Sequence, residues 1–130
     1  MCFSAQADLV VGIGVTALGV DALRHVRGRS ERAVAALPIV LGLHLLTEVP
    51  VWRGLDGHLP ESVWRPAMLV YLVIAFGVVP VLVPMAIGAL EPARRRRWSW
   101  AFVALGAGVA AVLVHSLVRG PVDAAIVGHH

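Results

Sequence analysis

Four apolar stretches, each long enough to cross a lipid bilayer as a helix, constrain this chain more than any other feature. They cover about residues 5–23, 33–52, 67–90 and 98–118, and a spanning helix needs roughly 20 mostly apolar residues. The chain is 58% hydrophobic and 15% charged, whereas soluble domains carry roughly 25% charged residues. A core made by 130 residues could not bury so much apolar surface. The sequence therefore predicts one all-α domain over residues 1–130, a transmembrane helical bundle of four spans.

The arginines predict how the spans are oriented. They are concentrated in two loops, between the first and second spans and between the third and fourth, while the middle loop has only Arg53 and Arg65. The members of the two rich loops are Arg24, Arg27, Arg29, Arg32, Arg94, Arg95, Arg96 and Arg97. Basic loops stay in the cytoplasm, so both termini are expected outside, in a bacterial plasma (inner) membrane. Arginines confined to such loops do not form a phosphate-binding face, so nucleic acid is not an expected partner.

Small residues predict which helix faces make contact. The first span carries Asp8, Gly12, Thr16 and Gly19 on one stripe, and the fourth carries Ala104, Gly108, Ala111 and His115. Small residues let helices approach closely in lipid. Both stripes are therefore expected at helix contacts, with Asp8 and His115 directed into the bundle. The prolines of the third span, Pro80 and Pro84, predict a kink.

The second span contains the most informative polar pair. His44 and Glu48 are four residues apart and so share a helix face, with Thr47 on the same side. Ionisable residues at membrane depth are costly and usually face a bundle interior or a watery cavity. The pair could bind a ligand, relay protons, or hydrogen-bond across one turn and hold helices together, the last reading being about as well supported as any binding role.

Histidine, cysteine and carboxylate groups are transition-metal ligands, and two histidines can hold haem iron. The expected metal ligands are His44 and Glu48 first, then Cys2 and His115, with Asp8 and Thr47 supporting them. The chain has no CxxC, HExxH, P-loop or GxGxxG motif, so an enzyme is not expected. The N-terminus has no basic region ahead of its apolar run, so a cleavable signal peptide is not expected either.

The opening Met1-Cys2-Phe3-Ser4-Ala5 and the pattern of His44, Glu48 and Trp52 resemble a family of bacterial polytopic membrane proteins of unknown function. Members begin MCFSA and carry His/Gln-x-x-x-Glu-x-x-x-Trp in the second span. They usually have glycine after the glutamate, where this chain has Val49. They also usually continue into further spans, so a short or truncated member is expected. The resemblance implies no activity.

Three functions are compatible with these features. The leading prediction is a membrane protein that binds a metal ion or small ligand in an outward-facing polar pocket. The alternatives are a structural or accessory subunit of a larger membrane complex, and a proton or solute transport subunit. Four spans are few for a transporter monomer, so the transport alternative requires a homo-oligomer.

Overall fold

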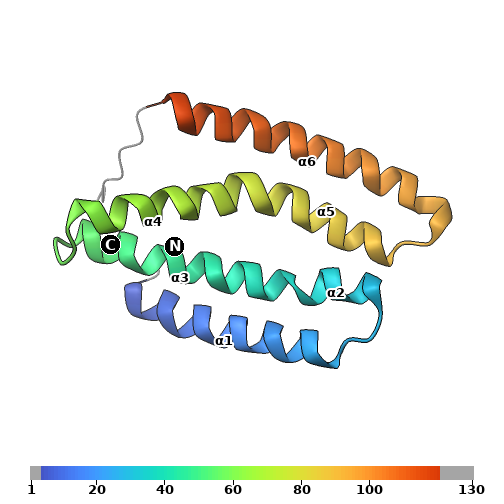
Figure 1. Ribbon diagram of the computed structural model, residues 1–130, viewed down its shortest axis with the longest axis horizontal. Coiled ribbons are helices and arrows are strands. Elements are labelled where there is room, and N and C mark those ends of the chain that lie inside the picture. Colours follow the sequence, from blue (N-terminus) through green and yellow to red (C-terminus); the bar gives the residue numbers. More distant parts are fainter. Residues whose placement is uncertain (1–3, 121–130) are drawn as a thin grey trace.

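The computed structural model describes residues 4–120, apart from the side chains of Ala93 and Arg94. The chain forms α1 (Ala5–His25), α2 (Arg29–Ala35), α3 (Leu37–Leu55), α4 (Glu61–Val73), the π-helix η1 (Ile74–Val78), α5 (Val79–Leu90) and α6 (Ala93–Arg119) (Figure 1). Four helical stretches are long and apolar enough to cross a membrane. These are Ala5–His25, Arg29–Leu55, Glu61–Leu90 and Arg95–Arg119, and the four predicted apolar stretches lie within them.

The helices lie side by side in a row that follows the order of the chain (Figure 1). Helix α1 packs on α3, α3 on α4, and α5 with η1 on α6, while α2 contacts α5. The apolar side chains that are buried among the described residues are Ala35, Met68, Ala86 and Ala110, and many large apolar side chains are exposed on each of the four helical stretches. Helices that pack within lipid are expected to have such a surface, because lipid covers it.

Prolines mark the places where the second and third stretches depart from a regular α-helix. Pro38 is the second residue of α3, two positions after Ala36, which separates α2 from α3. Pro80 is the second residue of α5, which follows η1 directly. Proline has no N–H and its ring clashes with the carbonyl four residues earlier, and the wider turn of a π-helix relieves that clash. A π-helical turn thus precedes Pro80 in the third stretch, where the sequence predicted a kink.

The α1–α3 contact is made by the predicted stripe of the first span. A Cβ atom on Gly42 would overlap the Thr16 hydroxyl and lie 2.7 Å from the Thr16 backbone nitrogen. A Cβ atom on Gly19 would lie 2.8 Å from the Ile39 nitrogen. Gly12 is buried in the same contact, and its carbonyl accepts a 2.7 Å hydrogen bond from Thr16 Oγ1. The prediction for this face of α1 is confirmed.

The α5–α6 contact uses a different face of α6 from the predicted one. Gly106 lies against the Pro80 carbonyl, and a Cβ atom there would come within 2.9 Å of the carbonyl carbon. Ala110, one turn later, is buried. A Cβ atom on Gly108 would meet no described atom of a neighbouring helix within 4 Å. The predicted stripe is wrong for α6, since its other members, Ala104, Ala111 and His115, are exposed.

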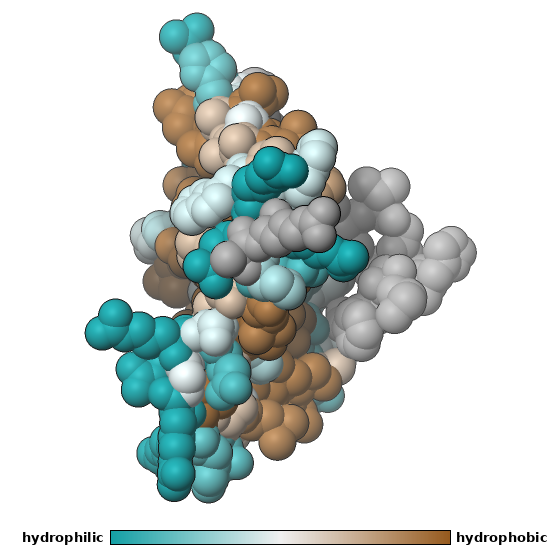
Figure 2. All heavy atoms as spheres, turned by 90° about the vertical axis from the view of Figure 1, so that its right-hand side faces the viewer, coloured by the Kyte–Doolittle hydropathy of each residue, from teal (hydrophilic) through white to brown (hydrophobic). Residues whose placement is uncertain are grey.

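The row of helices has two ends with different chemistry. At the turn end, α1 begins after Ser4 and residues 56–60 connect α3 to α4. At the arginine-rich end, residues 26–28 connect α1 to α2 and residues 91–92 connect α5 to α6. Figure 2 faces the arginine-rich end and shows hydrophilic residues gathered there beside apolar surface.

Candidate functional site

The most deeply buried charged side chain is that of Asp8, near the start of α1. It is 1% exposed, and its Oδ2 has no hydrogen-bond partner among the described residues. Asp8 lies in the first turn of α1, after the N-cap Ser4, whose hydroxyl accepts a 3.3 Å hydrogen bond from the Ala7 nitrogen. The helix dipole favours a carboxylate in this turn. Burial of an unpaired oxygen is still costly, which makes Asp8 a candidate binding group.

Three side chains of α3 stand one turn apart along the face beside Asp8: His44, Glu48 and Trp52. The Glu48 carboxylate is close enough to Asp8 for the two charges to repel each other, and it also lies near Trp52. The His44 ring stacks on Tyr71 of α4, with centroids 4.2 Å apart and planes 14° from parallel. Asp8, His44, Glu48, Trp52 and Tyr71 together are called the polar cluster below.

Several polar atoms of the cluster are buried without a partner. Besides Asp8 Oδ2, they are His44 Nδ1 and Trp52 Nε1, neither of which has a hydrogen bond to a described residue. Trp52 Nε1 lies near Glu48 without acceptable hydrogen-bond geometry. The hydrogen bond considered between His44 and Glu48 is not formed within residues 4–120, and the Thr47 hydroxyl donates to the His44 carbonyl at 2.7 Å. His44 and Glu48 therefore do not satisfy each other's hydrogen-bonding groups.

The structure unites only part of the predicted metal site. Asp8 and Glu48 lie close together, whereas His44 is connected to them only through Tyr71. Cys2 lies outside the described residues. His115 is exposed on α6, so the expectation that it points inward is wrong, because α6 packs through Gly106 and Ala110. Within residues 4–120, no three His, Cys, Asp or Glu side chains are arranged to hold a metal ion.

A cavity of about 520 Å³ lies at the turn end, next to the cluster along the helices. Ser4, one turn before Asp8, contributes to its lining, as do Arg53, Asp56 and His58. No two described charged groups in this lining form a salt bridge. The cavity is therefore lined mainly by polar side chains and lies beside the polar cluster.

Two members of the cluster were not predicted. Trp52 entered the sequence analysis only through the family pattern, although it stands four residues after Glu48 on the same face. Tyr71 is the only ionisable side chain of the apolar stretch 67–90, which was the available signal for its role. Its partner on α3 depends on how α4 packs, and the sequence pattern does not specify that.

The fold and the cluster define a small helical protein with four helices able to span a membrane and a buried polar centre between α1, α3 and α4. The chain belongs to a family of unknown function (DUF6629), whose family model matches residues 1–130. No curated protein and no solved structure matches the chain significantly.

Proposed function

We propose that this is a multi-pass protein of the bacterial plasma membrane that binds a small ligand in the polar cluster. The arginine-rich end lies in the cytoplasm by the positive-inside rule, and the turn end, with the cluster and both termini, lies outside. Membrane insertion is supported by the four apolar helices and by the few side chains buried between them.

The observation that carries the binding proposal is the unpaired, fully buried Asp8 oxygen beside a second carboxylate, Glu48. Buried charges are normally paired or bound to a cation. A ligand with a positive charge or several N–H donors would satisfy both carboxylates. His44 Nδ1 would accept from or donate to it, according to its tautomer, and Trp52 Nε1 would donate to an acceptor on the same ligand.

A metal ion is one form of this ligand. Imidazole and carboxylate are suitable groups for a transition metal, but a tetrahedral site needs more ligands than His44 and Glu48 supply. Cys2 is the further ligand expected from the sequence. A compact organic cation does not need several ligands around one point. The described geometry of the cluster therefore supports an organic cation better than it supports a metal ion.

The test is native mass spectrometry with elemental analysis of the detergent-purified protein, compared with the double variant Asp8→Asn/Glu48→Gln. These substitutions keep side-chain size and remove both charges. We expect the parent to carry about one non-lipid ligand or metal ion per chain and the variant to carry none. The matched control is Asp21→Asn/Glu61→Gln, which removes two exposed carboxylates that pair with His25 and Arg65 and should retain the ligand.

A parent protein without any bound species other than lipid, and without a thermal shift on adding divalent metals or small amines, would contradict the binding proposal. The polar cluster would then serve to hold helices together, as expected of a structural or accessory subunit.

Proton transfer is a second candidate, favoured by the run of titratable groups across three helices, from Asp8 through Glu48 to His44 and Tyr71. Such chains of groups carry protons in membrane pumps and transporters. In proteoliposomes containing a pH-sensitive dye, this function predicts proton flux that Glu48→Gln abolishes and Glu61→Gln leaves unchanged. Equal flux in the parent and in Glu48→Gln would exclude a proton path through Glu48.

A further inference from the structure

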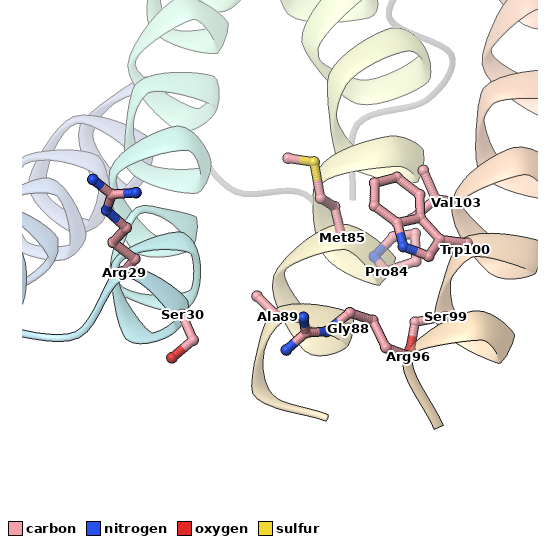
Figure 3. Close-up of a pocket in the computed structure, with 10 residues that line it drawn as sticks. All are labelled: Arg29, Ser30, Pro84, Met85, Gly88, Ala89, Arg96, Ser99, Trp100 and Val103. Atoms are coloured by element: carbon pink, nitrogen blue, oxygen red, sulfur yellow. The ribbon is translucent and has the colours of Figure 1, made fainter. Parts of the chain in front are cut away.

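A second cavity, of about 510 Å³, lies at the arginine-rich end, far from the polar cluster (Figure 3). Its walls come from α2, from the last turns of α5 and from the first turns of α6. Figure 3 shows the Arg96 side chain extending from α6 across the end of α5 on the side of α2. The cavity therefore lies between helices of which one, α2, is far from the others in the sequence.

The polar part of this cavity is positively charged. Arg29 and Arg96 line it together with the hydroxyl-bearing Ser30 and Ser99, and its lining contains no Asp or Glu. Neither arginine forms a salt bridge with a described residue. The contrast with the neighbouring hollow is informative, because Arg95 and Arg97 line that one together with Glu91. The cavity between α2, α5 and α6 thus presents two cations and two hydroxyls without a compensating anion.

The remaining wall is apolar and runs away from the arginines along the helices. Met85, Trp100 and Val103 belong to it, and Val103 is about 10 Å of helix rise beyond Arg96. Helices α5 and α6 approach each other closely at Gly88, because a Cβ atom there would lie 2.5 Å from Ser99 Cβ. A ligand that fits must therefore carry an anionic group at one end and an apolar portion extending from it.

We propose that this cavity binds an anionic phospholipid, with its phosphate held by Arg96 beside Ser99, its acyl chains along Met85, Trp100 and Val103, and Arg29 adding positive charge at the α2 wall. Basic pockets between helices at the cytoplasmic surface bind anionic lipid head groups, and arginine pairs with phosphate through two hydrogen bonds. The inference uses the proposed membrane orientation and is independent of any ligand in the polar cluster, which lies at the opposite end.

The test is competition between lipids, measured by native mass spectrometry on the full chain in detergent. Equal amounts of phosphatidylglycerol and phosphatidylcholine are added to delipidated protein. Two arginines near the membrane surface should favour the anionic lipid roughly 30-fold. The variant Arg29→Gln/Arg96→Gln should lose most of this preference. The control Arg27→Gln/Arg95→Gln removes the same charge from the same two loops and should keep it, and circular dichroism confirms that both variants are helical.

Three results would overturn the proposal. The parent could show no preference for phosphatidylglycerol. The two variant pairs could lose preference equally, which would indicate the general field of the loops instead of a site. Glycerol 3-phosphate, which has the phosphate without acyl chains, could displace the lipid at equal concentration, which would indicate a site for free phosphate esters. Loss of the cluster ligand in Asp8→Asn/Glu48→Gln would leave the lipid preference unchanged, so the two proposals fail separately.

Discussion

At the residue scale, the balance of charge around Asp8 is the central physical feature. Two carboxylates, Asp8 and Glu48, repel each other beneath the turn end, and the titratable groups beside them in the cluster are His44 and Tyr71. Two like charges buried side by side cost free energy unless a cation compensates them. A cation bound at these two carboxylates, as the proposed function requires, would therefore stabilise the folded protein.

Asp8→Asn should stabilise the ligand-free protein by about 1–3 kcal/mol, because it removes a buried charge while preserving the size of the side chain. The free energy of unfolding in mixed detergent measures this after chelator treatment and dialysis. Asp21→Asn is the control, since Asp21 is exposed and should change the free energy by less than about 0.5 kcal/mol. A loss of stability in Asp8→Asn would instead indicate that the carboxylate holds the helices together.

At the element scale, small residues and prolines determine how the helices pair. Pro84 cannot donate an N–H to the Pro80 carbonyl, as a residue four positions later in an α-helix normally would. Gly106 lies against that carbonyl, so α6 approaches α5 at the place where the proline leaves the backbone accessible. The proline of one helix and the glycine of the next thus form one contact.

Gly106→Ala should reduce stability by about 1–3 kcal/mol, because the added methyl group overlaps the Pro80 backbone and overpacks the contact. Gly108→Ala is the matched control, two residues along the same helix, where the new methyl group meets open space. Thermal unfolding of both variants in the same detergent compares them. Equal effects would show that the α5–α6 contact does not depend on the close approach at Gly106.

The sequence predicted the elements better than their faces. The four long apolar helices followed from hydropathy and length, and the α1 face followed from the spacing of Asp8, Gly12, Thr16 and Gly19. The α6 face did not, because Gly106 and Gly108 lie on different sides of the helix and composition does not distinguish them. The face of α6 that packs on α5 depends on the carbonyl of Pro80, which belongs to another helix. For the same reason His115 was predicted to point inward and is exposed.

At the scale of the whole molecule, the open row of helices places two kinds of chemistry at opposite ends. His44 and Glu48 were predicted as a shared site from their spacing, and the structure adds Asp8, Trp52 and Tyr71 through the packing of α1 and α4 on α3. The cavity between Arg29 and Arg96 could not be predicted, because it needs α2, α5 and α6 to meet. From the sequence alone, these arginines were interpreted only as signals for the orientation of the helices in the membrane.

Both proposals require the helices to cross a bilayer with the arginine-rich end in the cytoplasm, and cysteine labelling tests this most directly. Cys2, the one cysteine of the chain, is changed to serine, and either His58→Cys at the turn end or Glu31→Cys at the arginine-rich end is added. Both positions are exposed. In spheroplasts of a bacterial host, a membrane-impermeant maleimide should label His58→Cys at once and Glu31→Cys only after the membrane is permeabilised. Labelling of both before permeabilisation, or the reverse order, would contradict the account.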